Sequence, residues 1–153
     1  KIYGTRGVNY TALQDITMEI NQGEFVGIMG PSGAGKTTLL NIISTIDKPT
    51  SGSVLIDGDD IVKMKDAQLS NFRRNKLGFI FQDFNLLDTL TVKENMILPL
   101  TLAGVNHRVI ELRSEEVSKL LGIEDILNKY PYEISGGQKQ RTAAARAMIH
   151  KPK

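Results

Sequence analysis

Gly30-Pro-Ser-Gly-Ala-Gly-Lys-Thr37 is the stretch that decides the fold, because it completes the pattern G-x-x-x-x-G-K-[ST]. The apolar run Glu24–Met29 before it predicts a buried strand, and Lys36–Ser44 after it predicts a helix. Glycines let backbone N–H groups turn toward an anion, and the first turn of the helix adds its unpaired N–H groups and positive dipole end. Lys36 is then placed to reach β- and γ-phosphates, and the Thr37 hydroxyl to bind Mg²⁺. The motif in this strand–loop–helix setting predicts a nucleoside triphosphate site.

The composition is that of an ordinary globular chain of one domain. Its 153 residues are 41% apolar and 24% charged, and the net charge of +2 gives no reason to expect a nucleic-acid partner. Cysteine is absent, which excludes disulfides and thiolate metal sites. No apolar run reaches the roughly eighteen residues of a membrane span. Because the chain starts without Met and stops directly after a helical pattern, we expect both ends to be cut from a longer sequence.

Three further segments have strand patterns. Apolar and polar residues alternate over Ala12–Ile20, which predicts a half-buried strand. Ser53–Val62 predicts two strands around an Asp57-Gly58 turn, a strong hairpin signal. Leu77–Phe81 predicts a buried strand that ends at Gln82.

Beyond Gln82 the periodicity becomes helical. Thr91-Val-Lys-Glu94 has the spacing of a capping box, which predicts a helix from Thr91 to near Gly104. A second helix is predicted over His107–Leu121, with Gly122 as its stop. A third is predicted to begin after Ser135.

That third helix opens with Ser135-Gly-Gly-Gln138, a second arrangement suited to anions. Ser135 is a good N-cap, and the two glycines leave backbone N–H groups uncovered by side chains. Alone, such a start is either an ordinary cap or an anion site. It gains weight because a phosphate loop, a strand-end Gln82 and this element follow one another on one short chain.

In this order the motifs resemble those of the nucleotide-binding domain of ATP-binding-cassette (ABC) transporters. The phosphate loop is Gly30–Thr37 with Thr38 following, and Gln82 stands as the Q-loop glutamine. The signature motif is Ile134–Gln138, with Ile where Leu is commoner. Phe79–Asn95 is most similar to the antimicrobial-peptide (bacitracin-type) export branch, which neighbours the macrolide-export and lipoprotein-release transporters.

The resemblance implies an α/β fold: a P-loop NTPase core, with a mixed sheet and an antiparallel β subdomain, plus a helical subdomain. Residues 1–82 would form the core with the phosphate loop and hairpin, and 83–134 the helical subdomain. Residues 135–153 would carry the signature motif and a helix that returns to the core.

The resemblance also implies a head-to-tail dimer, in which the phosphate loop of one subunit and the signature motif of the other close on one ATP. Tyr3 would stack on adenine, with Tyr10 less suited because it lies nearer the first strand. Lys36 and Gln82 would act in catalysis, and Thr37 and Gln82 on Mg²⁺. The nucleotide-binding residues implied are Tyr3, Gly30, Pro31, Ser32, Gly33, Ala34, Gly35, Lys36, Thr37, Thr38, Ser135, Gly136, Gly137 and Gln138.

A membrane-spanning permease subunit is the further partner implied, with the cassette cytoplasmic and peripheral on the inner face of the cell membrane. Gln82 would relay nucleotide occupancy to it. The apolar side chains that follow Gln82 either line the groove for this permease or belong to the core of the subdomain. They are Phe84, Leu86, Leu87 and Leu90.

The next elements of the family are not among these residues: an apolar strand ending in Asp-Glu, a dimer-contact loop and a switch histidine. Val54–Asp57 resembles that strand but continues into a hairpin, and neither His107 nor His150 follows such a strand. Because the strand would be central to a parallel sheet, its absence is expected to expose apolar surface. We therefore expect the chain as it stands to bind nucleotide weakly and not to hydrolyse it.

Two functions of different classes remain. The first is an ATP hydrolase that drives export of a peptide or other amphiphile, as in antimicrobial-peptide resistance. The second is a non-hydrolytic or regulatory soluble ATP-binding module of the same superfamily. The segment after Gln82 has no long coiled-coil insertion and the chain has no second cassette, which favours transport.

Overall fold

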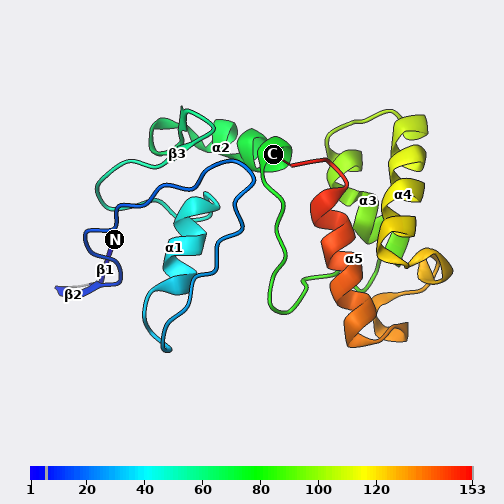
Figure 1. Cartoon of the computed structure of the whole chain (residues 1–153), viewed down its shortest axis with the longest axis horizontal. Helices are drawn as coiled ribbons and strands as arrows, with labels where there is room; N and C mark the ends of the chain where they lie inside the picture. Colours follow the sequence, from blue (N-terminus) through cyan, green and yellow to red (C-terminus); the bar gives the residue numbers. More distant parts are fainter. Residues whose placement is uncertain (6, 153) are drawn as a thin grey trace. The chain divides into compact units, whose positions relative to one another are not determined.

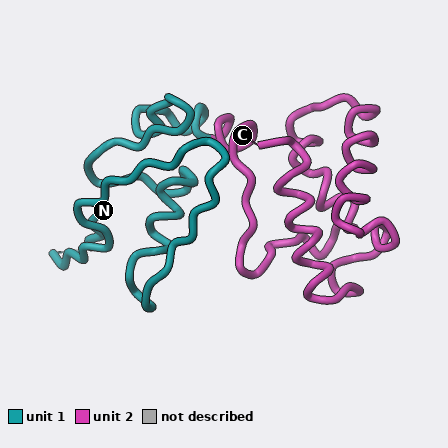
Figure 2. The backbone as a smooth tube through the Cα atoms, in the orientation of Figure 1, with its two compact units in different colours: residues 1–69 teal, residues 70–153 magenta. Residues whose placement is uncertain are grey.

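The computed structural model describes residues 1–5 and 7–152, and the chain divides into two compact units, Lys1–Leu69 and Ser70–Lys153 (Figure 2). The boundary falls inside helix α2 (Asp66–Lys76). The predicted division at 82/83 and 134/135 therefore stays a prediction, and Lys153, its last residue, lies outside the described residues.

The described residues of the first unit form one complete α-helix, the start of α2 and two small antiparallel hairpins (Figure 1). Its elements are β1 (Ile2–Thr5), β2 (Val8–Thr11), α1 (Lys36–Ile43), β3 (Leu55–Ile56), β4 (Asp59–Asp60) and the 3₁₀ turn η1 (Ile61–Lys63). In the first hairpin, which sequence reasoning did not predict, Tyr3 lies opposite Tyr10. The Thr50 hydroxyl accepts from the Ile2 N–H and donates to its carbonyl, at 2.9 and 3.2 Å. This hairpin is thereby attached to the segment that follows α1.

The second hairpin confirms the predicted Asp57-Gly58 turn. Both residues have positive φ, 53° and 81°, as a two-residue hairpin turn with the twist of its strands requires. The strands are shorter than predicted, because the Asp60 carboxylate accepts the Val62 N–H at 3.1 Å and starts η1. The hairpin prediction is thus right in position and too long in extent.

The strands predicted over Ala12–Ile20, Glu24–Met29 and Leu77–Phe81 are not formed in this structure. Within residues 1–5 and 7–152 these segments join no ladder, and the two sheets contain only β1–β2 and β3–β4. Their apolar side chains are correspondingly open, with Phe25 100% and Met29 92% exposed. An apolar pattern reports which side chains a sheet would bury, but a strand exists only where a neighbouring backbone pairs with it.

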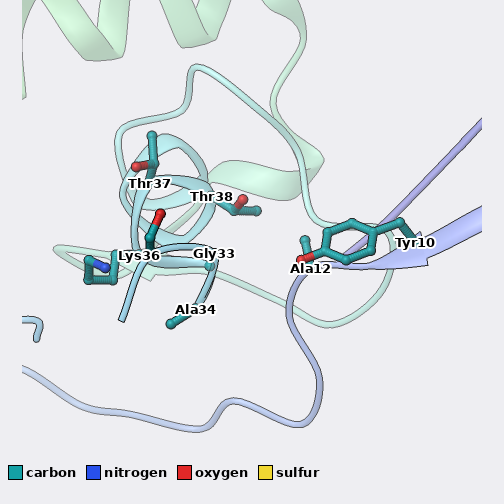
Figure 3. Close-up of a pocket in the computed structure, with 9 residues that line it drawn as sticks. Tyr10, Ala12, Gly33, Ala34, Lys36, Thr37 and Thr38 are labelled. Atoms are coloured by element: carbon teal, nitrogen blue, oxygen red, sulfur yellow. The ribbon is translucent and has the colours of Figure 1, made fainter. Parts of the chain in front are cut away.

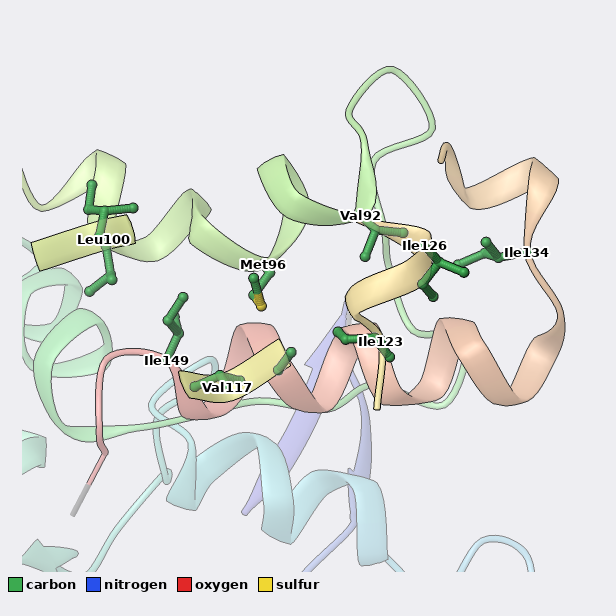
Figure 4. Close-up of a cluster of buried hydrophobic side chains, with 10 residues drawn as sticks. Val92, Met96, Leu100, Val117, Ile123, Ile126, Ile134 and Ile149 are labelled. Atoms are coloured by element: carbon green, nitrogen blue, oxygen red, sulfur yellow. The ribbon is translucent and has the colours of Figure 1, made fainter. Parts of the chain in front are cut away.

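The second unit is a helical bundle with its own core (Figure 4). Its elements after α2 are α3 (Val92–Leu102), α4 (His107–Leu121), η2 (Glu124–Ile126), η3 (Pro131–Glu133) and α5 (Gly136–Met148). Apolar residues at helical spacing point inward from α3 and α4, as the 3.6-residue period demands. The cluster is Val92, Met96, Leu100, Ile110, Val117, Ile123, Ile126, Ile134, Ala145 and Ile149.

The helix ends confirm the predicted signals. The Thr91 hydroxyl accepts from the Glu94 N–H at 3.2 Å, and the Glu94 carboxylate accepts from the Thr91 N–H at 2.7 Å. Gly122 ends α4 in the left-handed conformation, and Ser135 caps α5. None of the helices that the structure describes is long and apolar enough to span a bilayer.

Candidate nucleotide-binding site

The phosphate loop is wound around the side chain of Lys36. The Nζ of Lys36 donates to the carbonyls of Gly30 and Pro31, each at 2.8 Å. The path of the loop depends on positive φ angles at its three glycines, 156° at Gly30, 82° at Gly33 and 85° at Gly35. Residues with a Cβ rarely adopt such angles, so the glycines of the motif are required by the backbone itself.

Gly35 is required for a second reason, since it is packed against the segment that follows β2. A Cβ at Gly35 would lie 2.6 Å from the carbonyl oxygen of Ala12 and 2.7 Å from Cδ2 of Leu13. Gly35 is also the N-cap of α1, and it has no side chain that could occupy the helix start. The first hydrogen bond of the helix runs from the Leu39 N–H to the Gly35 carbonyl, at 2.9 Å. The three preceding N–H groups, of residues 36–38, are therefore left to bind an anion at the positive end of the helix.

A hollow of about 270 Å³ lies over this helix start (Figure 3). Its walls are Tyr10, Ala12 and residues 32–38, so the predicted motif residues from Ser32 to Thr38 are brought together. Thr37, which carries the hydroxyl predicted to bind Mg²⁺, is one of these lining residues. Mg²⁺ takes oxygen ligands and keeps several waters, so one hydroxyl beside a set of phosphate oxygens fits its chemistry.

Tyr3, the predicted adenine-stacking residue, is not among the described residues that line the hollow. The Tyr3 hydroxyl donates to Asp47 at 2.6 Å, and the Lys1 ammonium lies 4.6 Å from the centre of its ring. The bond to Asp47 raises the pKa of Tyr3, and a weaker opposing effect comes from the hydroxyl of Thr38 in the wall. Tyr10, the less favoured candidate, itself lines the hollow. Nothing in the sequence indicated that Tyr3 and Tyr10 pair directly across β1 and β2, which places both side chains on one face of the hairpin.

The signature segment is built as a capped helix start in the second unit. The Ser135 hydroxyl accepts from the Gln138 N–H at 3.3 Å, and the Gln138 side chain accepts from the Ser135 N–H at 2.8 Å. A Cβ added at Gly136 or Gly137 would meet nothing within 4 Å among the described residues, and neither has a positive φ. Nothing in the described part of the fold thus calls for glycine here, and the helix start presents a bare backbone.

Gln82 also lies in the second unit, in a turn after the Leu77–Phe81 segment, with its side chain exposed. Of the apolar residues that follow it, Leu87 is 47% exposed, and Phe84, Leu86 and Leu90 are half-buried. The core residues of this unit are fully or almost fully buried. This difference favours a surface role for the four over membership of the core.

Known proteins share both the sequence and the fold. The ABC transporter ATP-binding protein YxdL of Bacillus subtilis is 57% identical over 95% of this chain and 56% of its own length. The bacitracin export ATP-binding protein BceA of Halalkalibacterium halodurans is 51% identical over 99% of this chain and 60% of its own length. A dimeric post-hydrolysis structure of the ATP-binding cassette MJ0796, bound to ADP and Pi, superposes with a TM-score of 0.89. It is 42% identical over 99% of this chain and 67% of that one.

These likenesses define the class: the fold is the α/β fold of P-loop ATP-binding cassettes. Residues 13–153 match the family model described as ABC transporter. The chain therefore belongs to the ABC transporter family. It spans a little over half the length of the curated relatives named above.

Proposed function

We propose that this chain is the ATP-binding part of an ABC transporter that hydrolyses ATP as a head-to-tail dimer and drives export across the cytoplasmic membrane. The observation that carries the proposal is the phosphate loop, wound around Lys36 beneath the free N–H groups of residues 36–38. Such a cradle favours the charge and geometry of a triphosphate.

Each of the predicted catalytic, metal-binding and base-stacking residues has a proposed task. Lys36 neutralises charge on the β- and γ-phosphates, and the hydroxyl of Thr37 holds Mg²⁺, which neutralises the charge that develops during phosphoryl transfer. Tyr3 stacks on the adenine base, and Gln82 orients the attacking water. Turnover is proposed for the whole protein, and these 153 residues alone are proposed to bind ATP without hydrolysing it.

The proposal of a dimer is supported by the bare helix start at the signature motif. Gly136 and Gly137 are open, so the backbone N–H groups beside Ser135 are accessible to a phosphate held by a second subunit. The related cassette MJ0796, 42% identical, has been solved as a dimer bound to ADP and Pi.

A membrane-spanning permease and an exported peptide or amphiphile complete the proposal. One relative at 51% identity is named as a bacitracin export protein, which supports this substrate class. The exposed and half-buried apolar side chains after Gln82 are proposed to meet the permease at the inner face of the membrane. The division into a core (1–82), a helical subdomain (83–134) and a signature segment (135–153) is proposed with it.

The test compares two lysine substitutions of equal charge change. Lys36→Ala removes the charge from the loop, whereas Lys63→Ala removes a side chain that is 84% exposed and paired with Asp60. Loss of about two charge-assisted hydrogen bonds to phosphate is expected to raise the Kd for Mg-ATP by roughly 100-fold or more. Lys63→Ala is expected to leave that Kd within twofold.

Calorimetric titration with Mg-ATP measures both constants. Equal affinities for the two variants and the parent would refute the site. In the whole protein, steady-state phosphate release distinguishes the transporter ATPase from a non-hydrolytic module, because the module would bind ATP without releasing phosphate.

A further inference from the structure

The segment that follows Gln82 is held from two different helices of the second unit. Arg146, in the last turns of α5, reaches one end of it, and Asn95, in the first turn of α3, reaches the other. Neither residue belongs to the motifs that define the nucleotide site. Their contacts show how this segment gets its shape.

Arg146 makes two charge-assisted hydrogen bonds to the main chain. Its Nη1 donates to the carbonyl of Asn85 at 2.6 Å, and its Nη2 donates to the carbonyl of Phe84 at 2.7 Å. The planar fork of a guanidinium suits two adjacent acceptors, which a single ammonium cannot match. Burial lowers the pKa of Arg146, but a guanidinium stays charged in proteins.

The two carbonyls belong to residues in an unfavourable backbone conformation. Phe84 has a φ of 60° and Asn85 a φ of 45°, both in the left-handed region, which is a true outlier for a bulky aromatic residue. Such a conformation persists only when its surroundings hold it. Because Arg146 binds the carbonyls of these same two residues, its fork is a contact that holds them.

Asn95 secures the other end and is itself fully buried. Its Oδ1 accepts from the Leu87 N–H at 2.7 Å, and its Nδ2 lies 3.0 Å from the carbonyls of Leu87, Leu90 and Thr91. Helices α3 and α5 share one apolar core, to which Met96 and Ala145 belong. Both anchors therefore stand on the same packed body.

We propose that Arg146 is a positioning residue that couples the signature helix α5 to the segment after Gln82, with Asn95 as its fixed second anchor. The inference rests on the proposed function. Ser135 caps the start of α5 and Arg146 lies eleven residues further on, about 16 Å along a rigid helix. A displacement of α5 when ATP is held at Ser135 moves the carbonyls of Phe84 and Asn85 with it.

Hydrogen exchange by mass spectrometry or NMR tests this in the protein with and without Mg-ATP. The reporters are the amides of Phe84 and Asn85, which donate to the carbonyls of Phe81 and Asp83. Arg146→Lys keeps the charge but loses the fork, and Arg146→Met loses both. The matched control is Arg141→Lys, an exposed arginine on the same helix.

Both Arg146 variants are expected to exchange these amides about 10- to 100-fold faster, with α3 and α4 unchanged, and Arg141→Lys is expected to match the parent. Adding Mg-ATP is expected to change the exchange of these amides in the parent and the control only. Unchanged exchange in Arg146→Met would overturn the inference, as would faster exchange throughout α3–α5, which would make Arg146 merely a residue of the core. If ATP-bound dimers form and the parent segment does not respond, the coupling is wrong; if ATP does not bind or no dimer forms with it, the proposed function fails instead.

Discussion

Replacing Gly35 by Ala is the change whose cost the structure defines most sharply. Gly35 and Gly33 have nearly equal φ angles, 85° and 82°. A Cβ at Gly33 meets nothing within 4 Å among the described residues, whereas a Cβ at Gly35 lies 2.6 Å from the carbonyl oxygen of Ala12. The two substitutions therefore share one penalty and differ in another.

The shared penalty is the left-handed conformation, which costs an L-residue about 1–2 kcal/mol. The second penalty applies to Gly35→Ala alone. Since the contacted atom is backbone, the loop or the Ala12 segment has to shift, and such overpacking costs about 1–3 kcal/mol. We expect Gly33→Ala to lower the free energy of unfolding by about 1–2 kcal/mol and Gly35→Ala by about 2–5 kcal/mol.

Urea denaturation followed by circular dichroism measures both values, provided that the slope with denaturant is the same for the three proteins. The Kd for Mg-ATP is a second measure, because only Gly35→Ala is expected to displace the start of α1. If Gly35→Ala costs no more than Gly33→Ala, the close packing of the phosphate loop on Ala12 is not present in solution. The reasoning from that contact would then be refuted.

Three further outcomes can be measured on the helical unit. Thr91→Ala breaks the capping box of α3 and is expected to lower stability by about 0.5–2 kcal/mol in urea denaturation. The backbone and hydroxyl bonds from Thr91 lower the pKa of Glu94, so its contribution to stability is complete above the ordinary glutamate pKa and is lost as pH falls through the lower folded value. Thr91→Ala keeps the backbone N–H and removes the hydroxyl, so it should weaken this acid dependence. A pH series of melting curves in which parent and variant lose the same stability on acidification would contradict this. Met96→Ala, at a fully buried position, is expected to lower the free energy of unfolding by about 2–5 kcal/mol, and Met148→Ala, at a 41% exposed position, by less than about 1 kcal/mol. Similar losses for the two variants would mean that Met96 is not part of the core.

The sequence alone determined the features whose interactions are local. The phosphate loop was recognisable because its glycines and Lys36 act within eight residues, and the lysine binds carbonyls five and six positions away. The starts of α3 and α5 and the stop of α4 were predicted at the correct residues, since each cap is a bond across three or four residues. Family membership follows from the same motifs taken in order.

Only the tertiary structure decided which segments pair and which side chains meet. Glu24–Met29 has the pattern of a buried strand, yet pairing depends on a distant backbone, and no pattern within the segment reports whether one is there. Tyr10 became part of the nucleotide hollow through its pairing in a hairpin, and Arg146 reached main-chain carbonyls 61 and 62 residues away. Such contacts depend on how whole helices and hairpins pack, because the local sequence around one residue does not indicate which distant residue it will contact.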